Sequence, residues 1–293
     1  MSATLCIDLG GTNLRAGVIA EGSVAEPQPV GHWPAPESLG AFRDRIDDLI
    51  SAHGVSRLGV AVPGLATGSR CAWVPNLPYL DGVDLASTFP DVRLALGNDA
   101  QLALLAEAAH GAAQTVSNAI LLAIGTGIGS AVLADGRIVR GANGAATSFG
   151  WASADMSDGG DDKHGWLERQ ASGRALDALA RRTELNKGAD LIAAATEGHA
   201  DAKAVLAGPA NALAATLAGA VALLGSEAVI VSGGVAEGIG VLSPMILPAL
   251  RRQLPPHLRA IEIVTGRFGP RASLFGAGLA AGVHALWTGR EGS

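Results

Sequence analysis

The chain has 293 residues, which is enough for two domains of ordinary size. Hydrophobic residues make up 48% and charged residues 16%, a composition that allows a large core and argues against disorder. The formal net charge is −6 and Lys and Arg form no cluster, which argues against a nucleic-acid-binding surface.

Residues 5–19 predict a strand, a tight glycine turn and a second strand. After Gly10 and Gly11, apolar residues recur at every second position, which is the period of a strand. A dinucleotide-binding fingerprint would instead lead into a helix. Glycines leave backbone N–H groups uncovered, and such groups attract phosphate. From this segment alone, an ordinary Gly-Gly hairpin is the alternative.

A second copy of this pattern occupies residues 122–133. Gly125 pairs with Gly10 at an offset of 115 residues. The repeat predicts a duplicated fold whose two hairpins face one another across a cleft. Asp8 is not duplicated, because Ala123 stands at the matching position. We therefore expect Asp8 to have a chemical role, holding Mg²⁺ or its water near phosphates.

The two cysteines, Cys6 on an expected buried strand and Cys71 in an expected loop, have no partner nearby in sequence. Reduced thiols and a cytoplasmic location are therefore expected. No signal peptide is visible before Asp8. Residues 204–226 could span a bilayer by length, but they contain Pro209 and many alanines, so a buried helix pair is expected and no membrane.

Between the two hairpins, residues 27–36 read as a proline-rich turn region and residues 37–53 as an amphipathic helix. A buried strand follows at 57–62. The loop over 74–85 contains Asn76, whose amide offers the donor and the acceptor that a sugar hydroxyl requires. A turn-forming asparagine before a proline is the alternative.

Asn98 and Asp99 lie between a predicted strand at 92–96 and a predicted helix at 101–111. Open α/β sheets place ligand-contacting groups at such junctions. An aspartate there could accept a proton from an attacking hydroxyl, and a helix N-cap is the alternative.

The second half begins with a glycine-rich loop that ends at Trp151, which is expected to pack in the core, with stacking on a sugar ring as the alternative. Residues 152–163 are acidic and irregular. With His164 they could suggest a metal site, but carboxylates in such a loop are usually solvated. A helix is expected over 165–181, and 190–224 is largely helical.

A buried strand is predicted over Ala228–Ser232. Gly233 and Gly234 follow it and would let the backbone lie flat against a planar ligand such as adenine. A last strand is expected at 261–265 and a final helix from residue 274.

Together these motifs resemble the ROK family (repressor, open reading frame, kinase), within the actin-like ATPase fold, over residues 7 to about 281. The resemblance implies an α/β, two-domain actin-like ATPase (ribonuclease H-like) fold with a duplicated βββαβα core. A small domain would cover 1–113, joined by a C-terminal helix at about 280–293, and a large domain would cover 114–279. The motifs that carry the resemblance are residues 8–13, 76–78, 98–100, 125–129, 135–136, 140–144, 165–168 and 232–234.

Carried over residue by residue, the resemblance implies roles on both substrates. Asp99 would be the general base that takes the proton of the attacking hydroxyl, most often the 6-OH, and Asp8 would hold Mg²⁺ through water. The residues implied to bind the sugar are Asn76, Asn98, Asp99, Ser148 and Glu168. The residues implied to bind ATP are Asp8, Gly10, Gly11, Thr12, Asn13, Gly125, Thr126 and Gly127 at the phosphates, with Gly233, Gly234 and Gly276 at the adenosine.

The sequence also departs from the family pattern. Many members have glutamate and histidine where Ser148 and Trp151 stand, and the histidine often ligates zinc with cysteines that follow. No cysteine lies between Trp151 and Glu168, and Trp166 stands where one would be expected, so no structural zinc is expected. Losing one carboxylate from the sugar pocket should shift the preferred sugar.

The resemblance therefore implies a glucokinase-like cytoplasmic transferase that phosphorylates a hexose or amino-hexose with ATP and Mg²⁺. Its partners would be a small-molecule sugar, with no nucleic acid and no membrane, and a homodimer is one arrangement found in the family. One alternative is a non-catalytic sugar sensor or repressor, which would be expected to carry a helix-turn-helix domain before Leu5 and to have lost Asp99. A kinase for an unusual amino sugar or a polyol is the other alternative.

Overall fold

The computed structural model describes residues 3–23 and 25–288, which form two units. Unit 1 comprises the described residues up to Gly111, Arg137–Ala146, and those from Pro270 on. Unit 2 comprises Ala112–Gly136 and Thr147–Gly269. The domain bounds of 1–113 and 114–279 stay a prediction. The two units differ from them by placing residues 112–113 in unit 2 and residues 137–146 and 270–279 in unit 1.

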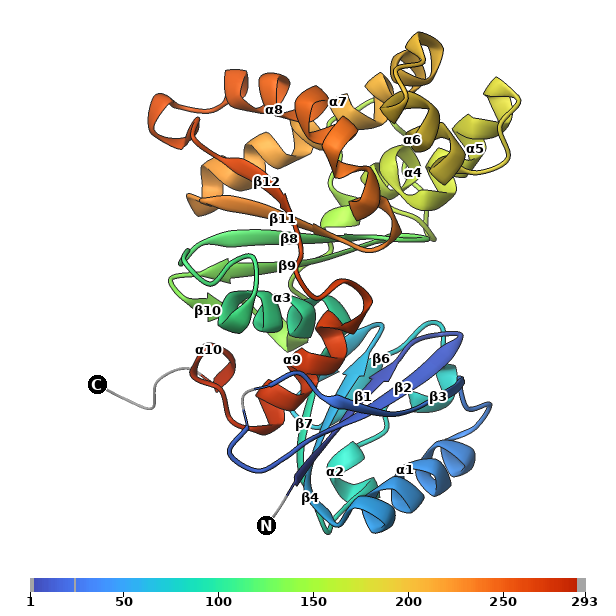
Figure 1. The fold of residues 1–293 in the computed structure, drawn as a ribbon, viewed down its shortest axis with the longest axis vertical. Coiled ribbons are helices and arrows are strands. Elements are labelled where there is room, and N and C mark those ends of the chain that lie inside the picture. Colours follow the sequence, from blue (N-terminus) through green and yellow to red (C-terminus); the bar gives the residue numbers. More distant parts are fainter. Residues whose placement is uncertain (1–2, 24, 289–293) are drawn as a thin grey trace. The chain divides into compact units, whose positions relative to one another are not determined.

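Unit 1 is built on a five-stranded sheet with the order β3-β2-β1-β4-β7 (Figure 1). Strands β1, β4 and β7 run parallel, and Asp8 of β1 pairs with Ala61 of β4, which pairs with Gly97 of β7. The carboxyl ends of these three strands therefore lie at one edge, where open α/β sheets bind ligands. The strands are β1 (Ala3–Leu9), β2 (Asn13–Ile19), β3 (Gln28–Pro34), β4 (Val55–Val62) and β7 (Arg93–Asn98), with a separate hairpin of β5 (Leu65–Thr67) and β6 (Arg70–Trp73).

The helices of unit 1 bury apolar stripes against this sheet. Helix α1 begins after Ser38, whose hydroxyl accepts from the Ala41 N–H at 3.2 Å, and buries Phe42 and Ile46. Helix α9 packs against β1, β4 and β7 and against α3. The helices are α1 (Leu39–His53), α2 (Leu85–Thr88), α3 (Asp99–His110), α9 (Ala272–Ala281) and α10 (Ala285–Thr288). The predicted C-terminal helix at 280–293 is represented by α10, and residues 289–293 lie outside the described range.

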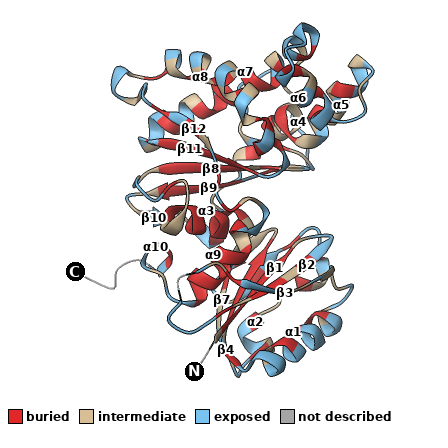
Figure 2. Ribbon diagram, in the orientation of Figure 1, coloured by how far each residue is buried: buried red, intermediate tan, exposed pale blue. Residues whose placement is uncertain are grey.

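The second sheet has the order β10-β9-β8-β11-β12, with β8, β11 and β12 parallel. Its core packs side chains of the strands against α7 and α8, among them Leu122, Leu213, Val229 and Leu242. Figure 2 shows the central strands of both sheets as buried. The elements are β8 (Ala119–Ile124), β9 (Ile128–Ala134), β10 (Arg137–Ile138), α4 (Trp166–Ala171), α5 (Gly173–Ala180), α6 (Gly188–Thr196), α7 (Ala200–Leu224), β11 (Ala228–Ser232), α8 (Ile239–Gln253) and β12 (Glu262–Thr265).

The two sheets follow one plan, which confirms the duplicated fold. In each, a hairpin of antiparallel strands is followed by a strand that pairs parallel with the first strand of the hairpin, and then by another that pairs parallel with that one. Strand β8 corresponds to β1, and Ala123 pairs with Ser232 of β11 where Asp8 pairs with Ala61 of β4. The α/β class and the duplication predicted from the two glycine hairpins are therefore correct.

Three local predictions were wrong. Residues 27–36 contain strand β3 rather than only a turn, because β3 is an edge strand and tolerates prolines. The helix expected over 165–181 breaks at Ser172, whose backbone is extended (φ −72°, ψ 166°). Cys71 is buried in strand β6 rather than in a loop.

Residues 204–224 of the apolar run at 204–226 lie in one continuous helix, α7, which ends at the C-cap Gly225, and not in a helix pair. Pro209 removes one backbone donor, and the helix continues because Leu206 and Leu213 on both sides are buried. By length and composition, α7 is the one helix among residues 3–23 and 25–288 that could cross a membrane, and half of its apolar window is buried inside the protein. That burial is the pattern of a core helix.

Candidate active site

The first glycine turn joins β1 to β2 and is closed by the Gly10 N–H, which donates to the Asn13 carbonyl at 2.8 Å. Gly11, Thr12 and Asn13 are exposed. A Cβ atom on Gly11 would lie 2.8 Å from the Cβ of Asn76. Close approach therefore requires glycine at position 11, and the fold brings Asn76 beside the turn predicted to bind phosphate.

Asn76 is exposed, and a different residue fixes its loop. The Asp81 carboxylate accepts from the Val74 N–H at 2.6 Å and closes the turn that contains Asn76. The turn-forming role considered for Asn76 thus belongs to Asp81. The Asn76 amide lies at the surface, where a ligand can reach it.

Asp8 is the last residue but one of β1, with its side chain 14% exposed, and Arg15 Nη1 lies 3.3 Å from its Oδ2. Burial raises the pKa of Asp8 above its ordinary value, while hydrogen bonds from Ser273 and Arg15 act in the opposite direction. Mg²⁺ binds through one or two carboxylates together with phosphate oxygens and water. Asp8 fits such a site because a cation there would also offset its repulsion with Asp99.

Asn98 is the N-cap of α3. Its Oδ1 accepts from the backbone N–H groups of Ala100 (3.0 Å) and Gln101 (3.2 Å), and its Nδ2 donates to the Gly64 carbonyl (3.0 Å). The N-cap role that was considered for Asp99 therefore belongs to Asn98. The same contacts fix the direction in which α3 begins, and with it the position of Asp99.

Asp99 is the first residue of α3, and its Oδ1 accepts from the Ala100 N–H at 2.7 Å. Burial and the neighbouring Asp8 carboxylate raise the pKa of Asp99 to about 6, against hydrogen bonds from the backbone and from Asn98. A carboxylate with this pKa is ionised at neutral pH and is a stronger base than an exposed aspartate. Such a group suits proton abstraction.

The second glycine turn joins β8 to β9 in unit 2, and the Gly125 N–H donates to the Gly127 carbonyl at 3.0 Å. Gly233 has a left-handed backbone (φ 82°), and a Cβ on it would lie 2.5 Å from the Ile124 carbonyl oxygen. Gly234 has open space beside its α-carbon. The structure thus brings together, at the ends of β8 and β11, glycines predicted to bind phosphate and adenosine.

Glu168 lies in α4 with its side chain 16% exposed. Its Oε1 accepts from Arg174 Nη2 at 2.5 Å and lies 3.7 Å from His164 Nδ1. A Cβ on Gly127 would lie 2.7 Å from the same oxygen, so the carboxylate touches the second glycine turn. Arg174 could not be recognised from the sequence, because its contact depends on the helix break that separates it from Glu168.

Ser148 is exposed just before a 3₁₀ turn at Phe149–Trp151. Ser130 holds this segment, because its hydroxyl accepts from the Phe149 N–H at 3.1 Å. Trp151 is 48% exposed, so the expectation that it packs in the core was wrong. Its ring lines a surface hollow with Met156.

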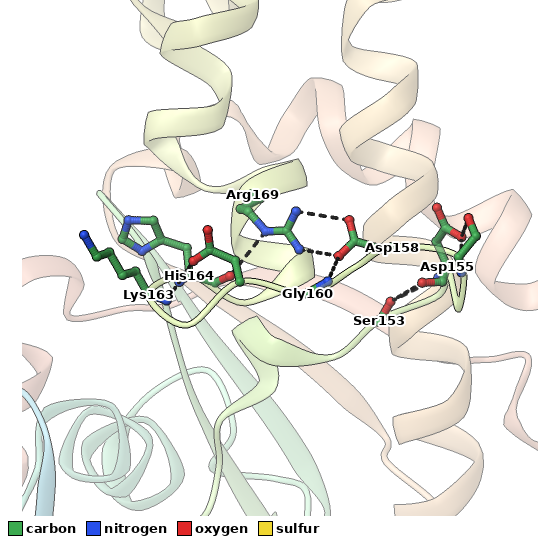
Figure 3. Close-up of polar contacts among 9 residues, drawn as sticks. Ser153, Asp155, Asp158, Gly160, Lys163, His164 and Arg169 are labelled. Atoms are coloured by element: carbon green, nitrogen blue, oxygen red, sulfur yellow. Dashed lines mark hydrogen bonds and ion pairs between the residues drawn. The ribbon is translucent and has the colours of Figure 1, made fainter.

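The acidic segment after Trp151 is held by its own carboxylates (Figure 3). Asp158 forms a bidentate ion pair with Arg169, whose Nη1 and Nη2 donate to Oδ2 and Oδ1 at 3.1 and 2.6 Å. Asp161 accepts from the backbone N–H groups of Lys163 and His164, both at 2.7 Å. Among residues 3–23 and 25–288, no group of three or more His, Cys, Asp or Glu side chains could hold a metal ion.

Gly276 does not lie where the prediction put it. It is buried in α9 of unit 1, and a Cβ there would lie 1.8 Å from the Leu102 carbonyl oxygen in α3. Glycine at this position allows two helices to pack closely. Because Gly276 is enclosed by helix packing, its assignment to the adenosine is corrected.

Comparison with known proteins identifies the family. The ROK family model matches residues 4–282. The chain belongs to the ROK family. It is 30% identical to an N-acetylmannosamine kinase of Escherichia coli O9:H4 (strain HS), over 95% of this chain and 98% of the relative. The sugar-kinase resemblance drawn from the motifs is therefore confirmed.

Solved ROK structures share the fold. A ROK hexokinase from Thermus thermophilus matches with a TM-score of 0.76 at 26% identity, over 97% of this chain and 99% of that chain. A ROK family transcriptional regulator, a homologue of the E. coli MLC protein, matches with a TM-score of 0.81 at 22% identity, over 96% of this chain and 78% of that chain. Because an enzyme and a regulator share this fold, only the residues of the site can indicate whether a chain with this fold is catalytic.

Proposed function

We propose that this ROK-family sugar kinase transfers the γ-phosphoryl group of ATP to the 6-hydroxyl of a hexose or amino-hexose. The observation that carries the proposal is the Asp99 carboxylate, fixed at the start of α3 beside Asp8 with its pKa raised to about 6. A residue with this burial and charge environment is a candidate general base.

In the proposed reaction, Asp99 takes the proton as the sugar O–H bond breaks. The sugar oxygen then forms a bond to the γ-phosphorus while the bond to the β-phosphate oxygen breaks, and ADP leaves. Asp8 would hold Mg²⁺, which neutralises charge on the phosphates when it is bound. The protein's own contribution is mainly positioning, because phosphoryl transfer needs little covalent chemistry.

The remaining roles divide between the units. In unit 1, the turn at Gly10–Asn13 would contact phosphates, and Asn76 would contact the sugar. In unit 2, the turn at Gly125–Gly127 would contact phosphates, Gly233–Gly234 the adenosine, and Ser148 with Glu168 the sugar. Asn98 would contribute to the sugar site mainly by fixing Asp99, since both ends of its amide already bond to backbone.

An amino-hexose is the first substrate to test, because the E. coli relative named above is an N-acetylmannosamine kinase. Ser148 supports a preference that differs from many family members, since a hydroxyl replaces their carboxylate. Both cysteines are free and buried, which supports a reducing, cytoplasmic location. A homodimer stays a prediction.

A non-catalytic sugar-binding regulator is the second candidate, because a transcriptional regulator shares this fold. The retained Asp99, and the burial that raises its pKa, favour the enzyme. Turnover separates the two candidates: a regulator would bind sugar without releasing ADP.

The test is a coupled ADP-release assay with MgATP over glucose, mannose, allose, fructose, N-acetylated hexosamines, free aminoglucoses and polyols. Asp99→Asn should abolish sugar-dependent release while leaving nucleotide affinity within about twofold. Asp91→Asn, which changes an exposed aspartate before β7, is the matched control and should keep full activity. Undiminished turnover in Asp99→Asn would remove Asp99 from the mechanism.

A further inference from the structure

The break between α4 and α5 brings two successive residues, Gly173 and Arg174, into contact with the second glycine turn. The Gly173 N–H donates to the Gly125 carbonyl at 2.7 Å. A Cβ on Gly173 would lie 2.6 Å from that same oxygen, so a larger residue would push the junction away from the turn. The break is stabilised by Ser172, whose hydroxyl accepts from the Ala175 N–H at 3.3 Å and caps α5.

Arg174 follows directly and makes three contacts with one guanidinium. Its Nε donates to the Thr126 carbonyl at 3.2 Å, and its Nη2 donates to Glu168 Oε1 at 2.5 Å. The ring of His164 lies against it, with nitrogen separations of 3.0 and 3.1 Å. The guanidinium therefore joins the turn predicted to bind phosphate to the carboxylate predicted to bind sugar.

We propose that Arg174 is a positioning residue that fixes the Glu168 carboxylate and the Thr126 carbonyl in one arrangement. Glu168 has three rotatable side-chain bonds, and ordering them when sugar binds would cost conformational entropy. A charge-assisted hydrogen bond from a planar guanidinium holds the carboxylate before the sugar arrives. The inference rests on the proposed function, because it assigns Glu168 to the sugar.

A second consequence concerns the phosphate turn. Gly125 and Thr126 carry the two carbonyls that Gly173 and Arg174 contact, so the turn is held from the same junction that positions Glu168. Movement of the turn is thereby opposed by the contacts that hold Glu168, and movement of Glu168 by the contacts that hold the turn. Removing Arg174 should loosen both, whereas an amide at position 168 should affect sugar more than nucleotide.

The test compares Arg174→Ala and Arg174→Lys with Arg182→Ala, an exposed arginine of the same unit. Arg174→Ala should raise the sugar KM on the order of ten- to hundredfold, which corresponds to one charge-assisted hydrogen bond. Arg174→Lys should recover part of the sugar affinity, because an ammonium group can bond to one partner but cannot donate to Thr126 and Glu168 at once as the planar guanidinium does. Kinetics for Arg174→Ala that match Arg182→Ala would overturn the proposal.

A double-mutant cycle with Glu168→Gln shows whether Arg174 acts through Glu168. The effects on sugar KM should be non-additive, and additive effects would overturn the proposal. Crystal structures of the wild type and Arg174→Ala give a readout that needs no turnover. Unchanged positions of Glu168 and of the turn at Gly125–Gly127 would overturn the positioning role, whereas a wild type without sugar turnover would overturn only the proposed function.

Discussion

Gly127 and Glu168 are in direct contact, since a Cβ atom on Gly127 would lie 2.7 Å from Oε1 and 3.1 Å from Cδ of Glu168. The left-handed backbone that often requires glycine is not the cause, because Gly127 has no positive φ. Rotation of the carboxylate away from an added Cβ would break the hydrogen bond that Arg174 donates to the same oxygen. Glycine at position 127, which was predicted only to bind phosphate, therefore also leaves space for the Glu168 side chain.

Gly127→Ala should displace the Glu168 carboxylate and raise the sugar KM about tenfold or more. The reason is the loss of a hydrogen bond to a charged group, worth about 1.5–3 kcal/mol. Steady-state ADP release at saturating ATP measures the change. Gly219→Ala is the matched control, because no atom lies within 4 Å of a Cβ built there in α7. An unchanged sugar KM in Gly127→Ala would contradict the contact.

The raised pKa of Asp99 predicts how activity depends on pH. With a pKa of about 6, Asp99 is protonated in acid and cannot act as a base. The ratio kcat/KM for sugar should therefore rise with pH and level off above about pH 7. Measurement between pH 5 and pH 8 with constant ionic strength checks this. A profile that is flat down to pH 5 would exclude Asp99 as the titrating group.

The raised pKa of Asp99 also predicts how the free energy of unfolding depends on pH, which can be measured without an activity assay. The folded protein keeps the proton on Asp99 up to about pH 6, whereas the unfolded chain releases it near the ordinary value of 3.8. The free energy of unfolding should then fall between these pH values, by on the order of 2–3 kcal/mol for this group. Asp99→Asn should lack this slope and be more stable at pH 7, as urea unfolding at several pH values would show.

Some features could be predicted from sequence because their signal is local. The two glycine hairpins and the Asn98–Asp99 junction each lie within about a dozen residues, and all were placed correctly. Gly276 was misassigned because a glycine that admits a ligand and one that admits a neighbouring helix look alike in sequence. The break at Ser172 was missed because helical periodicity continues across it, and Arg174 was missed with it.

Trp151 shows a different limit. An indole is usually buried, and only the tertiary structure reveals that this one is exposed beside Met156. Strand β3 was missed because proline disfavours strands in general, and its position at the sheet edge removes that penalty. Both errors arise where tertiary context overrides local preference.

Asn98 should separate a structural from a catalytic contribution. Asn98→Ala loses the cap of α3 and the bond to Gly64, and should lower the free energy of unfolding by about 2 kcal/mol. Ser38→Ala, which removes the cap of α1, should cost about 1 kcal/mol without changing activity. Urea unfolding and ADP release, measured on the same preparations, test both.

Asn98→Asp adds a sharper measurement. Aspartate can still accept from the Ala100 and Gln101 N–H groups, so the cap is kept, but it cannot donate to the Gly64 carbonyl as Asn98 does. It also puts a negative charge beside Asp99. The pKa of Asp99 should rise, and the acid limb of the kcat/KM profile should move to higher pH. A limb that stays in place would mean that the titrating group is not Asp99.

The ion pair between Asp158 and Arg169 should control the mobility of the acidic segment that ends at His164. Arg169 follows Glu168 in α4 and also donates to the His164 carbonyl at 3.2 Å, so the pair ties this segment to the helix that carries Glu168. Asp158→Asn should speed trypsin cleavage after Lys163, which is exposed. Asp162→Asn, an exposed aspartate in the same segment, is the control. Salt at 0.5 M should move the wild type toward the variant by screening the pair, whereas equal cleavage of both variants would show that the segment is held without it.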